Sequence, residues 1–390
     1  MKILAVHNYY QNPGGEDYVF EAETRLLESR GHEVLRYVDD NERIGRWSTV
    51  PAGVSAVWSR TAYRRIREIV RREKPEIVHF HNTLPLISPS ALHAARSNGT
   101  AIVHTLHNYR LLCPMGRFFR NGAVCEDCLG KTPAWPGVLH ACYRDSRVAT
   151  GAVAAMLAVH RTMGTWNEKP HLYIALTEFA RGKFIEGGLP AEKIVVKPNF
   201  VAPDPGAGTG DGDYALFVGR LSPEKGIDAM LAAWDRLEGR VPLVVVGDGP
   251  LAERVADAAA GSDRLRWLGW RPREEVHALL RSARFLVFPS LWYETFGLGI
   301  VESFAAARPV LATALGAPAE IVAEGKTGWL VPPGDPAALA AGLERAWGDP
   351  AAASGMGRAA RAENEARYTE ERGYEDLMRI YRLAIERAHA

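Results

Sequence analysis

Two glutamates, Glu294 and Glu302, bracket a glycine-containing stretch in the second half of the chain. An apolar run at 285–288 ends at a proline just before this stretch, and a helical pattern at 300–307 follows it. A short apolar run that stops at a proline is typical of a buried parallel strand. We therefore expect a strand, a loop and a helix N-terminus, whose free N–H groups and positive dipole suit a phosphate.

The two glutamates are expected to have different roles, because about two helical turns separate them. Glu294 lies in the predicted loop, where it can bind one polyol, and Glu302 lies along the helix, where it can bind a second. A nucleotide-sugar has this layout, with sugar hydroxyls and ribose hydroxyls on either side of a diphosphate. The alternative is an ordinary αβ unit with two solvated glutamates.

Two cations follow the strand predicted at 214–218. Arg220 stands at the carboxyl end of this strand, and Lys225 stands where the next helix begins. Two cations and helix N–H groups at one strand edge suit a diphosphate. Either residue taken alone would be an ordinary surface cation.

Glycines and a histidine follow predicted strands in the first half of the chain. Gly14 and Gly15 come after the strand at 3–6, and His107 comes after the strand at 101–106. Residues at the carboxyl ends of parallel strands face the crevice where open α/β sheets bind ligands, and glycine lets the backbone approach a ligand closely. The alternatives are a flexible turn at the glycines and a histidine that is merely hydrogen-bonded.

The segment 109–143 holds all four cysteines of the chain, Cys113, Cys125, Cys128 and Cys142. Their spacing, with a CxxC knuckle and two flanking cysteines, predicts a tetrahedral zinc site that would staple an irregular loop. Four thiolates would leave no open position, so such a zinc would be structural. Reduced free thiols and a redox function are the alternatives.

A predicted helix at 60–74 has apolar residues on one side and many cations on the other. The cations are Arg60, Arg64, Arg65, Arg67, Arg71, Arg72 and Lys74. The simpler interpretation is a solvated helix face. The more specific one is a contact with anionic lipid headgroups, which would make the protein peripheral at a membrane, or with an acidic acceptor.

Bulk composition is that of an ordinary globular protein, with 47% hydrophobic and 24% charged residues. The net charge of +1 gives no general attraction to nucleic acid or to anionic membranes. We expect no signal peptide and no segment long enough to span a bilayer. The expected location is therefore the cytoplasm, where thiols stay reduced.

The length of 390 residues indicates two domains. Alternating short strands and helices predict doubly wound α/β domains at 1–198, with 109–143 as an insertion, and at 214–365. The segment 199–213 is rich in glycine and proline, as linkers are. The amphipathic helix at 366–390 is expected to pack back on the N-terminal domain.

The ordered set of motifs resembles the retaining glycosyltransferases of family 4 (group 1). Glu294 and Glu302 match the E-x7-E motif of that family, and residues 219–226 match its phosphate-binding motif. Residues 246–250 and 325–331 match further signatures. The resemblance implies the GT-B fold, in which two doubly wound Rossmann-like domains face each other across a cleft.

The resemblance also implies roles for single residues. Arg220 and Lys225 would neutralise a diphosphate leaving group, Glu294 would bind the donor sugar, and His107 would touch that sugar near the reaction centre. Glu302 would hold the ribose. The remaining residues that would bind the nucleotide-sugar are Gly14, Gly15, Gly219, Gly247, Phe296, Gly297 and Leu298.

The implied reaction is the transfer of a sugar, with retention, from a UDP- or GDP-sugar to a glycan, lipid-linked or small-molecule acceptor. Such a reaction would serve polysaccharide or glycoconjugate biosynthesis and would need no catalytic metal, because the two cations and the helix dipole replace it. The alternatives are a GT-B sugar-nucleotide epimerase and a zinc-knuckle nucleic-acid-binding protein, which the pI near 7.8 disfavours.

Overall fold

The computed structural model describes residues 1–11, 14–40, 49–96, 99–209 and 212–390, with residues 49–52 described by their backbone alone. The chain divides into two compact units. Unit 1 comprises Met1–Phe118, Glu126–Pro198 and Gly373–Ala390, and unit 2 comprises Phe119–Cys125 and Asn199–Arg372.

The predicted linker, 199–213, belongs to unit 2 in its described part. The Arg281 guanidinium donates to the Pro205 carbonyl at 2.8 Å, and the Gly208 N–H donates to the Ala306 carbonyl at 3.0 Å. Residues 210 and 211 of the predicted linker lie outside the described residues.

Unit 1 is built on a six-stranded sheet in the order β2-β1-β3-β4-β7-β8, and all of its strand pairs are parallel. Its strands are β1 (Lys2–Tyr9), β2 (Glu33–Asp40), β3 (Ile77–Phe80), β4 (Ala101–Thr105), β7 (Leu172–Ala175) and β8 (Ile194–Val196). The central strands β3, β4 and β7 are buried throughout, as expected for a parallel sheet covered on both faces.

Nine helices of the described chain belong wholly or mainly to unit 1. They are α1 (Gly15–Ser29), α2 (Thr49–Val57), α3 (Arg60–Glu73), α4 (Ser90–Ala95), α5 (Trp135–Leu139), α6 (Arg147–Thr162), α7 (Thr165–Glu168), α8 (Glu178–Glu186) and α16 (Glu370–His389). Side-chain caps fix where several begin: the hydroxyls of Ser59, Ser146 and Thr177 accept backbone N–H groups of α3, α6 and α8.

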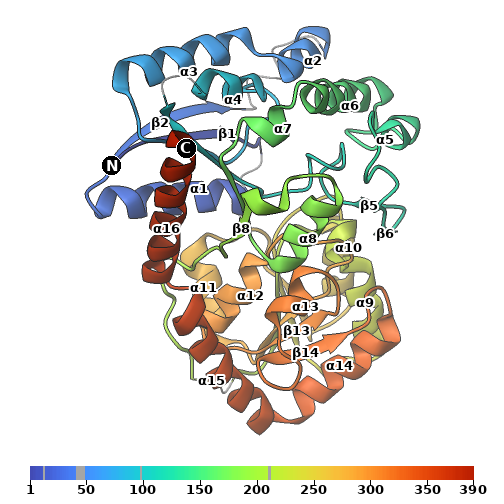
Figure 1. The fold of residues 1–390 in the computed structure, drawn as a ribbon. Coiled ribbons are helices and arrows are strands. Elements are labelled where there is room, and N and C mark those ends of the chain that lie inside the picture. The colour runs from blue at the N-terminus through green and yellow to red at the C-terminus, as the bar shows by residue number, and fades with distance from the viewer. Residues whose placement is uncertain (12–13, 41–48, 97–98, 210–211) are drawn as a thin grey trace. The chain divides into compact units, whose positions relative to one another are not determined.

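Helix α16, the last helix of the chain, covers one face of the sheet of unit 1. Its Leu377 and Tyr381 are fully buried in a cluster with Ile3 of β1 and Ile77 of β3. Figure 1 shows this helix, in red, beside the blue strands of that sheet. The two ends of the chain therefore contribute to one core, stabilised by burial of apolar surface.

Unit 2 is built on a second six-stranded parallel sheet, in the order β11-β10-β9-β12-β13-β14. Its strands are β9 (Ala215–Val218), β10 (Leu243–Val246), β11 (Leu265–Trp267), β12 (Phe285–Phe288), β13 (Val310–Thr313) and β14 (Gly328–Val331). Its helices are α9 (Ile227–Asp235), α10 (Ala252–Ala260), α11 (Arg273–Ser282), α12 (Leu298–Ala305), α13 (Ala317–Ile321), α14 (Pro336–Gly348) and α15 (Pro350–Arg367).

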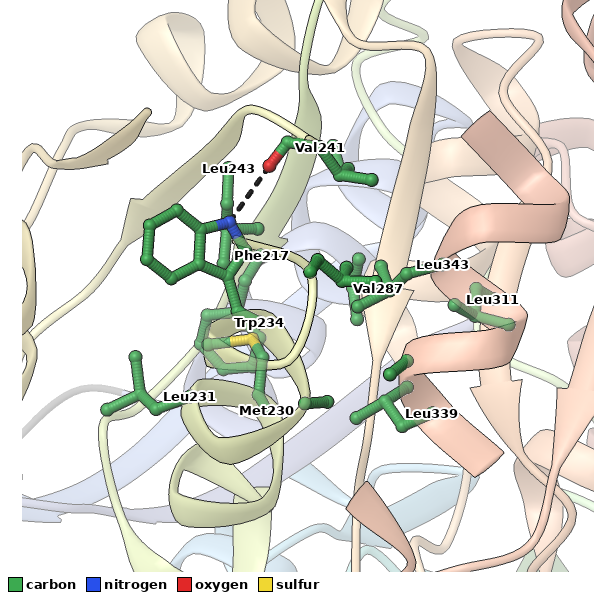
Figure 2. Packing of buried hydrophobic residues seen from close by; sticks show 14 of the residues in the cluster. Phe217, Met230, Leu231, Trp234, Val241, Leu243, Val287, Leu311, Leu339 and Leu343 are labelled. Atoms are coloured by element: carbon green, nitrogen blue, oxygen red, sulfur yellow. Dashed lines mark hydrogen bonds between the residues drawn. The ribbon is translucent and has the colours of Figure 1, made fainter. Parts of the chain in front are cut away.

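The core of unit 2 is a single large apolar cluster that joins α9 and α14 to the sheet. Trp234 belongs to this cluster. Its indole Nε1–H donates to the Val241 carbonyl at 2.8 Å (Figure 2). Because that donor is satisfied, the indole can be buried at no polar cost. The prediction of two doubly wound α/β domains is confirmed.

A two-stranded antiparallel hairpin, β5 (Phe119–Arg120) and β6 (Ala123–Val124), lies within the cysteine-rich segment. Short backbone turns order the rest of this segment. Tyr109 and Gly116 are paired by a 3.0 Å hydrogen bond, and Tyr109 packs on Phe118. Aromatic packing of Tyr109 on Phe118 and on Phe184 of α8 thus helps to order the segment, which its irregular sequence did not indicate.

Candidate functional site

The strand order of unit 2 defines where a ligand site is expected. The chain first winds outward from β9 to β11 and then returns to add β12 on the other side of β9. Ligands of doubly wound sheets bind outside the carboxyl ends of the strands at such a switch point. Arg220 and Lys225 follow β9, and Glu294 follows β12, so the structure brings these three predicted residues to that point.

The two loops at the switch point are packed directly on each other. The Leu291 N–H donates to the Glu224 carbonyl at 2.8 Å. Gly226 has φ of +73°, and a Cβ placed there would lie 1.9 Å from the Pro289 carbonyl oxygen. Only glycine fits this position, so the packing of the two loops holds Lys225 beside the loop that bears Glu294.

Glu294 is the centre of a hydrogen-bonded cluster. Its Oε1 accepts from Lys225 Nζ at 2.6 Å, from Ser290 Oγ at 2.7 Å and from Trp292 Nε1 at 2.9 Å. The Glu294 carboxylate is buried, and three donors, one of them charged, offset the cost of burying it. The sequence predicted both charged residues but not that they pair with each other.

Arg220 differs from Lys225 in its surroundings. Its side chain is exposed and forms no ion pair or hydrogen bond with the residues that the structure describes. The backbone N–H groups of Phe296, Gly297 and Leu298 likewise have no acceptor among the described residues. Gly297 caps α12 with φ of +108°, so these N–H groups mark the start of a helix. A cation and a helix N-terminus at one sheet edge can bind an anion.

Glu302 is buried on α12 and is paired with Arg273, the first residue of α11. Burial raises the pKa of Glu302, while the Arg273 guanidinium opposes that rise. Arg273 was missed by the sequence reasoning, because a cation at a helix start has no distinctive pattern. The role of Glu302 as the ribose ligand stays a prediction.

Gly219 and Gly247 lie between the loops that follow β9 and β10. The Gly219 N–H donates to the Val246 carbonyl at 3.0 Å. Gly247 has φ of +138°, and a Cβ there would lie 1.8 Å from the Gly219 carbonyl oxygen. The close approach of two loops therefore requires glycine at 247, and its predicted contact with the nucleotide-sugar stays a prediction.

His107 lies in unit 1, two residues beyond the end of β4. Its Nε2 is 2.9 Å from Nδ1 of His81, and the two rings are stacked with centroids 5.2 Å apart. His81 follows β3, the neighbouring strand. The sequence reasoning singled out His107 at a strand end but did not predict its contact with His81.

Gly14 and Gly15 start helix α1. The Gly14 N–H donates to Asp17 Oδ2 at 2.8 Å, and the other oxygen of Asp17 is 2.7 Å from His7 Nε2. Gly14 has an extended backbone with φ of −128°, and a Cβ there would meet nothing within 4 Å. No packing constraint therefore explains glycine at 14, which leaves room for the predicted contact with a ligand.

The predicted zinc site is not supported. All four cysteines are thiols, and no three of their sulfurs come within 4.8 Å of one another in the described chain. Cys128 instead packs in a small cluster with Ala134 and Ala154. A CxxC spacing places thiols close in sequence, but a zinc site also needs at least three ligand atoms to converge in space.

The basic helix is α3, and its cations all lie on its exposed side. Ala62, Ile66 and Val70 form its buried side. None of the described helices combines the length and the apolar character that crossing a bilayer requires.

Comparisons with known proteins agree with this architecture. Residues 13–205 match the family described as Glycosyltransferase Family 4, and residues 212–349 match Glycosyl transferases group 1. The chain is 30% identical over 314 residues to a D-inositol 3-phosphate glycosyltransferase of Frankia alni, which covers 73% of this chain and 70% of that protein. The protein therefore belongs to glycosyltransferase family 4.

Other similarities are more local or more distant. The chain is 38% identical over 160 residues to the D-rhamnosyltransferase WbpZ of Pseudomonas aeruginosa, a match that spans 40% of each protein. The chain thus spans about two fifths of the length of this curated relative. The structure of Anabaena HepE in complex with UDP-glucose has a TM-score of 0.68 and 18% identity, covering 97% of this chain and 98% of that one. This likeness confirms the predicted GT-B fold.

Proposed function

We propose that the protein is a retaining glycosyltransferase that moves a sugar from a nucleotide-diphosphate sugar to a hydroxyl group of an acceptor. The observation that carries this proposal is the cluster at the switch point of unit 2. Arg220, Lys225 and the N–H groups at the start of α12 offer positive charge at one sheet edge, the Glu294 carboxylate binds Lys225, and Glu302 lies further along α12. A diphosphate flanked by two polyols is the ligand that fits this arrangement.

Names of similar proteins support the choice of substrates. The HepE structure holds UDP-glucose, so a UDP-sugar is the first donor to test, with a GDP-sugar as the second. The curated relatives act, by their names, on inositol phosphate or transfer rhamnose. We propose a glycan, a lipid-linked glycan or a small metabolite as the acceptor. Family membership favours this function over the epimerase and the nucleic-acid-binding protein.

Catalysis would rest on stabilising the departing diphosphate. The bond between the anomeric carbon and the phosphate oxygen breaks, the acceptor oxygen bonds to that carbon on the same face, and the acceptor proton passes to the leaving phosphate. Arg220 and Lys225 would balance the charge that develops on the phosphate, without a metal. Glu294 and Glu302 would bind hydroxyl groups, so neither is assigned as a nucleophile.

In the proposed complex, Lys225 would bind both Glu294 and the diphosphate. Its ammonium already binds Glu294, so a bound diphosphate would draw on a cation whose position the carboxylate has fixed. Such a preorganised cation needs little reorganisation when the leaving group departs. We further propose that His107, Gly14 and Gly15 of unit 1 contact the substrates during the reaction.

The test is the turnover of UDP- and GDP-sugars by Arg220→Ala and Lys225→Ala, which we expect to fall by about a hundredfold, or about 3 kcal/mol. Arg240→Ala is the matched control, because Arg240 is an exposed arginine that precedes β10 at the opposite edge of the same sheet. Lys225→Arg keeps the charge beside Glu294 and should keep more activity than Lys225→Ala. Unchanged turnover in both alanine variants, or a product of inverted configuration, would contradict the proposal.

We also propose that α3 binds anionic membrane surfaces. Each exposed arginine near such a surface contributes about 1 kcal/mol, so replacing Arg64, Arg67 and Arg71 by glutamine should weaken binding to phosphatidylserine vesicles by about a hundredfold. Replacing three exposed arginines of unit 2 is the control: Arg236, Arg254 and Arg358. Equal binding by both triple variants would show that α3 is only a solvated helix face.

A further inference from the structure

The exposed large apolar side chains of the described residues are concentrated in one part of unit 1. Six of the eight lie on α2, α5 and α6 or directly after α6, and we call them the apolar surface: Val54, Trp135, Leu139, Val148, Val159 and Met163. The other two are Val38 on β2 and Trp270 after β11. Single exposed apolar residues are normal on a protein, but a group of them marks an interaction site.

The three helices that carry the apolar surface pack on one another. Helices α2 and α5 both contact α6, and Figure 1 shows the three next to one another in unit 1. His160 of α6 donates from Nε2 to the Val57 carbonyl at the end of α2, at 2.7 Å. Val138 of α5 packs on a small cluster that includes Ala154 of α6. The apolar surface therefore belongs to one packed group of helices.

The outer side of α6 lacks charge along most of its length. Val148, Ala155 and Val159 are exposed, and their spacing of seven and four residues places them on one side of the helix. The arginines of α6 stand at its two ends, Arg147 and Arg161, and the sequences of α2 and α5 contain no charged residue. A helix that faces water normally carries polar residues on that side. The outer side of α6 is therefore suited to contact with an apolar phase.

Cations border the apolar surface. The segment 131–147, which contains α5 and leads into α6, has three exposed cations, Lys131, Arg144 and Arg147, and a single acid, Asp145. The Lys131 ammonium lies over the ring of Trp135, 5.4 Å from its centroid. The basic helix α3 begins three residues after α2 ends. Apolar side chains that include a tryptophan, bordered by cations, are typical of helices that lie in the surface of an anionic bilayer.

We propose that the apolar surface inserts into the outer part of an anionic lipid bilayer, with the bordering cations at the lipid headgroups. The charges favour this occupant over a second copy of the chain. A symmetric dimer would use the same surface on both copies and would bring their cations together, whereas anionic lipid is complementary to them. Insertion goes beyond the attraction proposed for α3, because it depends on the burial of apolar side chains as well as on charge.

The first test is the binding of the full chain to vesicles of phosphatidylcholine and phosphatidylserine, measured by co-sedimentation without sugar substrates. Trp135, Leu139 and Val148 are 55%, 54% and 73% exposed, so each has apolar area left to bury. Replacing all three by alanine should weaken binding by about a hundredfold. The matched control is the pair Val38→Ala and Trp270→Ala, which removes exposed apolar side chains outside the apolar surface and should leave binding unchanged.

The second test reads insertion directly. Bromine atoms on lipid acyl chains quench the fluorescence of a tryptophan that lies among those chains. Vesicles with brominated lipid should quench the natural protein more than Trp135→Phe, which lacks the inserted indole. Trp270→Phe is the control, because Trp270 is the other exposed tryptophan of the described chain, and its quenching should equal that of the natural protein.

The quenching also separates the apolar surface from α3. Replacing Arg64, Arg67 and Arg71 by glutamine should lower the amount of protein bound, because it removes charges, but the molecules that remain bound should still be quenched through Trp135. Loss of that quenching would show that α3, and not the apolar surface, makes the contact with the lipid.

Three further results would overturn the proposal. They are vesicle binding by the triple alanine variant as tight as that of the natural protein, equal quenching of the natural protein and Trp135→Phe, and a dimer in lipid-free solution that the triple variant converts to a monomer. The last would assign the apolar surface to a second copy of the chain.

Vesicle binding is independent of the proposed transfer reaction. Bilayer insertion would favour the lipid-linked glycan among the proposed acceptors, and that step alone rests on the proposed function. Insertion by a protein without transferase activity would uphold the role of the apolar surface and reject the proposed function. Transferase activity in a protein that does not bind vesicles would do the opposite.

Discussion

The two units have the same doubly wound layout but place their charges in different parts of it. In unit 2 the core is apolar, and Arg220, Lys225 and Glu294 lie at the carboxyl edge of the sheet. In unit 1 charged groups lie inside, and Glu23 and Lys197 are each 2% exposed. The buried ion pair of unit 1 therefore joins groups inside the unit, whereas the pair of Lys225 and Glu294 in unit 2 lies at the edge of the sheet.

The strand orders explain part of this difference. The switch point of unit 2 lies between β9 and β12, which both end in loops with cations or free N–H groups. The order in unit 1 puts β1 next to both β2 and β3, so its switch point lies between β1 and β3. Strand β3 leads into His81, which contacts His107. The same rule of topology thus places different chemistry in the two units.

The largest expected difference between the two units is in how much stability each loses as the pH falls. Burial lowers the pKa of many histidines of unit 1: His79, His81, His93, His104, His107, His160 and His171. Unit 2 contains a single histidine, His277, whose pKa is lowered to about 4. Unit 1 should therefore lose far more stability than unit 2 as the pH falls.

The direction of this change in stability with pH follows from the protons that the histidines bind. The pKa of His79 is about 4 in the folded chain, below its unfolded value near 6.5, so its contribution is present above pH 6.5 and is lost as the pH falls toward 4. His79 alone accounts for about 3 kcal/mol. Hydrogen exchange at pH 7.5 and pH 5, resolved by unit, measures the effect. Equal loss of protection in both units would show that the buried histidines do not distinguish them.

A second prediction compares a glycine from each unit. Gly247→Ala should destabilise unit 2 by about 3 kcal/mol, because the new Cβ would overlap the Gly219 carbonyl at an unfavourable φ. Gly14→Ala should leave stability unchanged, because nothing lies near its Cβ, but should weaken substrate binding if Gly14 contacts the ligand. Thermal unfolding and donor titrations measure both. A Gly247→Ala variant as stable as the natural protein would show that close packing against Gly219 does not require glycine at position 247.

The smallest expected effect is the loss of stability when one buried hydrogen bond of unit 1 is removed. Tyr381→Phe removes the hydroxyl that lies 2.8 Å from Nδ1 of His79 and should cost about 1 kcal/mol. Trp234→Phe in unit 2 is the counterpart, since it removes the bond to the Val241 carbonyl. Denaturant unfolding of both variants gives the comparison. No loss of stability in Tyr381→Phe would show that water replaces the hydroxyl.

The fold could be predicted largely from the sequence, because alternating short strands and helices leave few arrangements other than doubly wound sheets. The residues at the switch point of unit 2, namely Arg220, Lys225 and Glu294, were also predictable, since each follows a strand. Their pairing was not, because Lys225 and Glu294 are 69 positions apart and meet only through two packed loops. Lys197 and Glu23, 174 positions apart, were beyond local patterns for the same reason.

The zinc prediction, which the structure does not support, shows a different limit of sequence patterns. Clustering of cysteines along the chain shows that thiols are close in sequence, but a metal needs their sulfurs to converge in space. In this segment Cys113 and Cys128 are both buried, and Cys128 packs with Ala134 and Ala154. Spacing alone could not reveal the aromatic pair of Tyr109 and Phe118 that orders the segment.

Calorimetric titration of UDP and GDP into the protein tests the central claim that unit 2 holds the diphosphate. Arg220→Ala and Lys225→Ala should each weaken the affinity for the nucleotide that binds by about tenfold or more, because each removes a charged contact to phosphate. Glu23→Gln, which changes only unit 1, should bind that nucleotide as the natural protein does. Unchanged affinity in both cation variants, or equal weakening in all three, would contradict the account.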